Sequence, residues 1–130
     1  MKLSEAIRLG AMLRPQGHGG LRKSQGGVLA TCALGAACDA VGIAIDASGS
    51  NMEAYAALRA RWPILREPVM HPEDGNMERM LEITYLLNDI SKWSRERIAD
   101  WVETVEPVCD AMMVDREREE ELCHVLAVSL

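Results

Sequence analysis

The clearest local signal for secondary structure in this chain is a predicted helix start at Ser94. It lies within residues 86–105 (LLNDISKWSRERIADWVETV). Serine is a favoured N-cap, because its hydroxyl accepts a hydrogen bond from an N–H group of the first helical turn. Trp93 and Ile98 occupy the two positions of a hydrophobic staple around that cap. The predicted helix repeats apolar residues at three-and-four spacing, on one face: Ile98, Trp101, Val102, Val105, Val108, Cys109 and Met112. This stripe predicts a helix on which the other elements pack.

Other segments also carry helix signals. Ser4 is the expected N-cap of a first helix, which Pro15 stops. A second helix is expected over residues 31–41, with Thr31 as N-cap and a left-handed Gly42 at its end. One face of this helix is made of small residues that would let another backbone approach closely: Cys32, Gly35, Ala36 and Asp39. Further helices are expected over residues 52–62 and 77–89, and after an N-cap at Asp115.

These signals predict an all-α fold, a single compact domain over residues 1–130 with five or six helices. A glycine-rich loop over residues 16–27 is expected between the first two helices, and a loose hairpin is an alternative there. Residues 42–46 alternate enough for one short strand.

Composition narrows the class of protein. The net charge of −6 argues against nucleic acid as a partner, because phosphate backbones attract concentrated Lys and Arg. The four cysteines form no CxxC pair, which indicates reduced thiols and a cytoplasmic protein. Charges at Glu5 and Arg8 interrupt any signal-peptide core, and residues 28–45 are too short for a membrane span.

Cys32 is the sharpest chemical candidate. In the first turn of a helix its thiolate would face unpaired N–H groups, which lowers a thiol pKa and raises reactivity. A nucleophilic cysteine also needs a base, for which His18, His71 and His124 are candidates, with Asn88 or Asp89 to orient the imidazole. The simpler interpretation is a small residue packed at a helix start. Cys109, Cys123 and His124 lack the paired spacing of zinc modules, so neither a metal nor another cofactor is expected.

The loop from Gly17 to Gly27 is a candidate anion or nucleotide site. It superficially resembles a phosphate loop, but Arg22 stands where the G-x-x-x-x-G-K-[ST] pattern requires Gly. A weaker anion site would use Arg14, His18, Arg22 and Lys23.

The polar side of the helix after Ser94 is mainly acidic. Its candidate interaction residues are Glu96, Asp100, Glu103 and Glu106. A solvated helix face is the simpler interpretation of such a row.

The segments Cys32-Ala33-Leu34-Gly35-Ala36, Asn88-Asp89 and Ser94 together resemble those of small bacterial and phage-encoded helical proteins for which no activity is established. The resemblance implies that the Cys32 turn and the Asn88-Asp89 turn belong to one unit. A buried carboxamide and carboxylate that accept from helix-start N–H groups would explain this pairing without catalysis.

We therefore expect a small cytoplasmic interaction or accessory protein, prophage-related, that binds an unknown protein partner or a second copy of itself through a surface. The alternatives are a thiol-dependent hydrolase or transferase that uses Cys32, and an anion binder that uses the glycine-rich loop.

Overall fold

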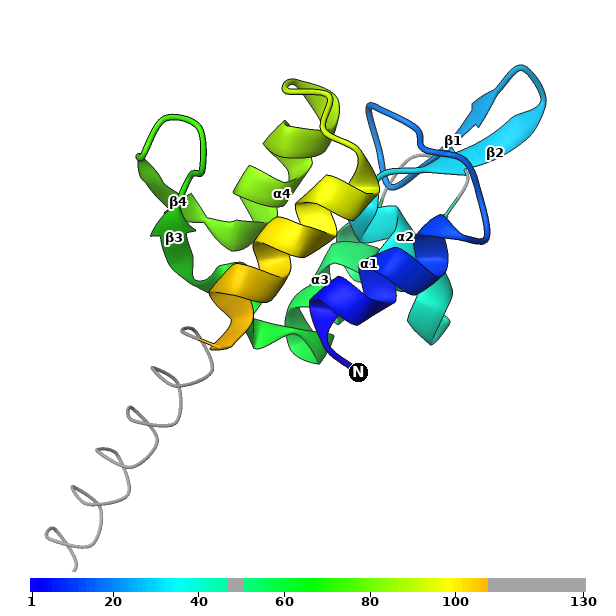
Figure 1. Ribbon diagram of the computed structural model, residues 1–130. Helices are drawn as coiled ribbons and strands as arrows, with labels where there is room; N and C mark the ends of the chain where they lie inside the picture. Colours follow the sequence, from blue (N-terminus) through cyan, green and yellow to red (C-terminus); the bar gives the residue numbers. More distant parts are fainter. Residues whose placement is uncertain (47–50, 108–130) are drawn as a thin grey trace, which may run out of the picture.

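The computed structural model describes residues 1–46 and 51–107. Two hairpins stand on opposite sides of a group of helices (Figure 1). Each hairpin forms its own two-stranded antiparallel sheet. The fold is a single compact, mostly helical domain, as the sequence predicts, but it has two hairpins where at most one was expected.

The first two helices pack closely against each other. Helix α1 (Leu3–Ala11) buries Leu3, Ala6, Ile7 and Gly10, which follow helical spacing. Helix α2 (Ala33–Val41) is buried over its whole first half and ends at Gly42 in the left-handed conformation, as predicted. A Cβ atom on Gly10 would lie 1.7 Å from the carbonyl oxygen of Ala36, so the close approach of the two helices requires glycine there.

The glycine-rich segment holds the first hairpin. Strands β1 (Arg22–Gln25) and β2 (Val28–Thr31) pair antiparallel, and Gln25 lies opposite Val28. Gly26 and Gly27 both have positive φ, which a two-residue type I′ turn requires. The preceding loop joins β2, because the N–H group of Thr31 donates to the carbonyl of Pro15 at 3.0 Å.

The middle of the chain forms the second hairpin between two helices. Helix α3 (Met52–Arg61) ends one residue short of the predicted Trp62, and the 3₁₀ helix η1 (Pro63–Arg66) follows. Strands β3 (Pro68–Met70) and β4 (Met77–Arg79) lead into helix α4 (Met80–Asp89).

The last described helix covers residues 95–107 and lies beside α1 (Figure 1). Its start confirms the sequence prediction, because the N–H group of Arg97 donates to Ser94 Oγ at 3.1 Å and both staple residues, Trp93 and Ile98, are buried. Val108, Cys109, Met112 and the helix expected after Asp115 lie outside the described residues. No helix in the two described ranges is long and apolar enough to cross a membrane.

Several predicted boundaries are wrong. Lys2 rather than Ser4 precedes α1, because a carboxylate far along the chain takes over the cap. Thr31 is the last residue of β2, so α2 is capped by Cys32 instead. Residues 43–46 form no strand. Residues 77–79, expected to be helical, pair with β3 instead.

Candidate functional site

The Cys32 turn and the Asn88-Asp89 turn meet at the start of α2. Cys32 is the N-cap of α2, and its Sγ accepts from the N–H group of Gly35 at 3.3 Å. The Oδ1 atom of Asn88 accepts from the N–H group of Ala33 at 3.2 Å. The side chains of α4 and of the cap therefore satisfy two helix-start N–H groups, which confirms that the two turns form one unit.

Asn88 also ties this unit to the loop after α1. Its Oδ1 accepts from Gln16 Nε2 at 3.0 Å, and its Nδ2 donates to the carbonyl of Gly17 at 2.9 Å. Nδ2 donates to Asp89 Oδ1 as well, at 2.7 Å. Asn88 is fully buried, and these bonds occupy both ends of its carboxamide. This arrangement joins three segments and leaves the carboxamide no group for a substrate.

The environment of Cys32 does not activate the thiol. Burial raises the pKa of Cys32 to about 11, and the N–H group of Gly35 offsets only part of this effect. The sequence-based expectation of a lowered thiol pKa is therefore wrong, because removal from water disfavours the thiolate more than the helix start favours it. A thiolate is the reactive form, so this cysteine is poorly suited to nucleophilic attack near neutral pH.

The two histidines of the described residues do not join Cys32. His18 makes no hydrogen bond or ion pair with any other described residue. His71 is buried in the second hairpin, where its Nδ1 accepts from the N–H group of Glu73 at 3.1 Å. His124 lies outside the described residues. Within residues 1–46 and 51–107, the structure thus forms no cysteine–histidine pair.

Asp89 has one carboxylate oxygen in use and one buried oxygen, Oδ2, without a hydrogen-bond partner among the described side chains. It lies near Cys32, whose pKa its charge raises further. It accepts from Asn88 rather than from a histidine or a helix-start N–H group, so of the two expected side chains only the carboxamide caps α2.

The arginines of the predicted anion site are paired within the protein. Arg14 Nε lies 3.0 Å from one carboxylate oxygen of Asp39, and an Nη atom of Arg22 lies 2.6 Å from the other. The side chain of Asp39, on α2, is only 7% exposed, and its single negative charge offsets one of these two positive charges. Only His18 and the exposed Lys23 remain of the four candidates, which is weak support for an anion site in this loop.

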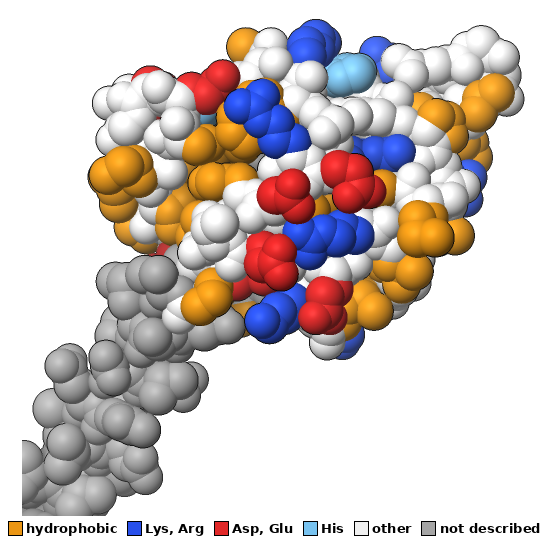
Figure 2. Space-filling model, viewed as in Figure 1, with side chains coloured by type: hydrophobic (Ala, Val, Ile, Leu, Met, Phe, Trp, Pro, Cys, Tyr) orange, Lys and Arg blue, Asp and Glu red, His pale blue; other side chains and the backbone are white. Residues whose placement is uncertain are grey.

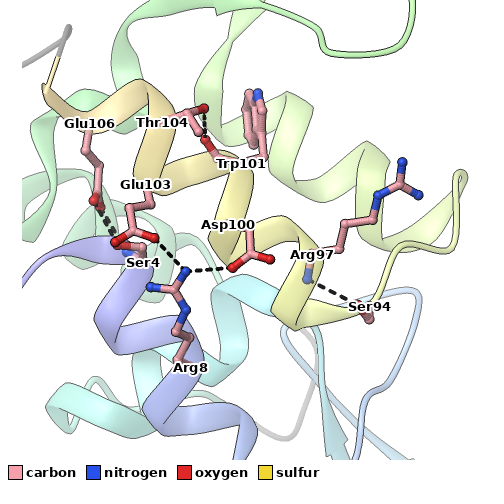
Figure 3. Close-up of polar contacts among 9 residues, drawn as sticks. All are labelled: Ser4, Arg8, Ser94, Arg97, Asp100, Trp101, Glu103, Thr104 and Glu106. Carbon is pink, nitrogen blue, oxygen red and sulfur yellow. Dashed lines mark hydrogen bonds and ion pairs between the residues drawn. The ribbon is translucent and has the colours of Figure 1, made fainter.

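Most side chains of the predicted acidic face bind residues of α1 and so hold the helix of residues 95–107 against it (Figure 3). One Nη atom of Arg8 lies 2.8 Å from both Asp100 and Glu103, and these hydrogen bonds raise the pKa of Arg8. Glu106 is buried, which corrects its placement on the exposed face: its carboxylate accepts from the N–H group and the hydroxyl of Ser4 at 2.9 and 2.8 Å. Glu96 remains exposed. Positive and negative side chains alternate on this face (Figure 2).

Arg95 has a structural role that was not predicted from the sequence. This side chain is buried and donates to Thr31 Oγ1 and to the carbonyls of Ala11 and Arg14, so it holds the end of α1 against β2. Burial lowers its pKa. The helical spacing of the sequence indicates burial, because it places Arg95 and Glu106 on the same helix face as Ile98 and Val102.

Within the described residues, no group of three or more His, Cys, Asp or Glu side chains is placed to hold a metal ion. Comparisons with protein-family models, with curated proteins and with solved structures find no match to this chain.

Proposed function

We propose that this chain is a small cytoplasmic interaction protein that acts through a binding surface rather than through chemistry. The buried hydrogen bonds of Cys32 and Asn88 support this choice over a thiol-dependent enzyme, since these polar groups already hold the fold together. Cys32 and Cys38 are free thiols, which is compatible with a reducing compartment.

The observation that carries the proposal is a group of exposed apolar side chains, which we name the apolar end. It comprises Leu9, Met12 and Leu13 of α1 and the following turn, with Val28 and Leu29 of β2. Met12 is 81% exposed and Leu13 61%. Apolar side chains lie over the first hairpin and the end of α1 along one margin of the molecule (Figure 2). Exposed apolar side chains gathered on one side of a molecule are typical of interaction sites.

The partner that this surface fits is a second copy of the chain. The five side chains carry no charge, so a two-fold axis can place the surface on itself without bringing like charges together. The charged regions are less suitable, because each copy carries a net charge of −6 and the copies repel each other elsewhere.

Sedimentation velocity of the full chain over a range of concentrations tests this proposal. We expect the wild-type chain to dimerise, and Met12→Glu and Val28→Glu each to raise the dimer dissociation constant by about tenfold or more, because each buries an unpaired charge. Met70→Glu is the matched control, since Met70 is 63% exposed but lies on the other hairpin. A chain that stays monomeric throughout, or a dimer that both apolar-end variants leave intact, contradicts the proposal.

A further inference from the structure

A second surface feature lies at the end of α3. A hollow of about 390 Å³ opens between the end of α3, η1 and the start of α4. Its lining residues are Arg59, Leu65, Arg66, Arg79, Leu81 and Glu82. Three arginines from three separate elements thus line the hollow together with two leucines, Leu65 and Leu81.

The guanidinium groups of these three arginines form no ion pair with a carboxylate among the described residues. Their side chains, on Arg59, Arg66 and Arg79, make no hydrogen bond or ion pair with another described residue. Arg8, Arg14 and Arg22, in contrast, each bind a carboxylate.

One carboxylate, that of Glu82, lines the same hollow, against three guanidinium groups, so the site stays positive in a chain of net charge −6. The start of α4 adds to the positive electrostatic potential in the hollow. Arg79 is the N-cap residue of α4 and no side chain caps that helix, which leaves its positive end facing the arginines. A negatively charged group in the hollow would be attracted by the arginines and by the start of α4.

A second, more apolar hollow shares part of its lining with the first. An adjoining space of about 300 Å³ is lined by Met52, Tyr55, Arg59 and Leu81, so the two spaces share Arg59 and Leu81. Met52, Tyr55 and Arg59 are three and four residues apart and therefore lie on one face of α3. We name the two spaces together the arginine groove. One end is cationic and the other offers a tyrosine ring and aliphatic side chains.

We propose that the arginine groove binds a phosphate monoester joined to a flat ring. Guanidinium groups donate paired hydrogen bonds that match phosphate oxygens, and several of them suit a dianion better than a monoanion. The ring would lie against Tyr55 and Leu81, next to the phosphate held by Arg59, Arg66 and Arg79. A volume of this size is typical of small-ligand sites. The proposal is independent of the self-association surface, which lies on other elements.

Isothermal titration calorimetry of the full chain with phenyl phosphate at low ionic strength tests the proposal. We expect saturable binding, which Arg79→Gln and Arg59→Gln each weaken by about tenfold or more, since each removes charge-assisted hydrogen bonds. Two variants with the same change of charge are controls: Arg61→Gln, two residues further along α3, and Lys23→Gln, in the glycine-rich hairpin. Neither residue lines the groove, so we expect binding to be unchanged in both.

The ring end is tested separately. Inorganic phosphate should bind more weakly than phenyl phosphate, and Tyr55→Leu should weaken phenyl phosphate while leaving inorganic phosphate unchanged. A nucleoside monophosphate and a phosphotyrosine peptide then distinguish free metabolite from modified protein as the source of the ligand chemistry. The thermal midpoint of each variant is measured first, and Arg66→Gln replaces any groove variant that does not fold.

Three outcomes overturn the proposal. The first is the absence of saturable binding at millimolar phenyl phosphate. The second is an equal loss in Arg79→Gln and Arg61→Gln, which indicates general attraction to positive charge. The third is a loss confined to Lys23→Gln, which places the site in the glycine-rich hairpin.

Discussion

Arg95 and Arg79 both stand at the start of a helix, but their surroundings differ. Arg95 is buried and its guanidinium donates to three oxygens, on Thr31, Ala11 and Arg14. Arg79 is exposed and has no acceptor among the described residues. The first arginine is a structural part of the α2 region, where α1, the loop, β2 and α4 meet. The second belongs to the arginine groove, where polar groups from three elements converge without bonding to one another.

The difference separates polar groups that hold the fold from polar groups left for a ligand. A buried polar group without a partner costs free energy, so the α2 region satisfies nearly all of its donors and acceptors internally. An exposed guanidinium carries no such penalty, because water solvates it. Substitutions in the α2 region should therefore lower the free energy of unfolding, and substitutions in the groove should leave it nearly unchanged.

The largest expected loss is for Gly35→Ala in the α2 region. A Cβ atom on Gly35 would lie 1.8 Å from the carbonyl oxygen of Leu21, so the backbone must move apart. We expect the free energy of unfolding to fall by about 3 kcal/mol or more. Urea unfolding measures it, with Gly20→Ala as the control, since a Cβ there meets nothing closer than 4.0 Å. Equal losses in both variants would contradict the close packing of α2.

Asn88→Leu should cost slightly less, about 2–3 kcal/mol, because it leaves the N–H group of Ala33 and the carbonyl of Gly17 buried without this partner. Urea unfolding again provides the measurement. Asn88→Asp is the sharper variant, because it keeps the acceptor for Ala33 but removes the donor to Gly17 and places a charge beside Asp89. A loss below about 0.5 kcal/mol for Asn88→Leu is the range of an ordinary surface substitution and would remove the central role of Asn88.

Glu106→Ala and Asp100→Ala compare a buried with an exposed carboxylate on the same helix. Glu106 caps α1 through Ser4, so its removal should lower stability by about 2 kcal/mol. Asp100 is 72% exposed and pairs with Arg8, a type of ion pair that contributes little. Its removal should cost about 0.5 kcal/mol or less, an effect that salt further reduces. Similar losses of free energy of unfolding in the two variants would show that the buried and the exposed carboxylate contribute equally.

Cys32→Ser tests the buried thiol through pH. Since the folded-state pKa of Cys32 is raised from 9.0 to about 11, the thiol contributes stability that is fully present below the unfolded-state pKa and is lost between these two values. Serine keeps an N-cap acceptor, with oxygen in place of sulfur, and does not ionise in this range. Relative to Cys32→Ser, the wild-type chain should therefore lose about 1 kcal/mol by about pH 10. A constant difference in stability from neutral pH to pH 10 would show that the thiol is not desolvated.

The parts of this fold that the sequence predicts are those set by neighbouring residues. The Ser94 cap, the staple of Trp93 and Ile98, and the left-handed Gly42 depend on residues within one or two turns. Helix boundaries failed where a distant group took over the local role. Ser4 is not an N-cap because Glu106, 102 residues away, accepts from its N–H group.

The functional residues follow the same rule. The sequence analysis selected Arg14 and Arg22 for an anion site because they lie among glycines, but Asp39 reaches both from α2. Arg59, Arg66 and Arg79 carry no shared local pattern, and only the packing of α3, η1 and α4 brings them together. The Cys32 and Asn88 turns do meet, through the hydrogen bond from Ala33 to Asn88.

The smallest expected effect is that of Arg79→Gln on stability, and it is the sharpest test of the comparison with Arg95. Because the Arg79 side chain has no partner among the described residues and lines the hollow together with Arg59 and Arg66, its removal should change the free energy of unfolding by no more than about 0.5 kcal/mol. Removing one guanidinium also relieves repulsion among the three, which can raise the free energy of unfolding slightly. Arg95→Gln is the control and should be clearly destabilising, because glutamine cannot reach all three oxygens that Arg95 binds. A loss of about 2 kcal/mol or more in Arg79→Gln would place Arg79 among the structural residues and remove the reason to expect a ligand in the groove.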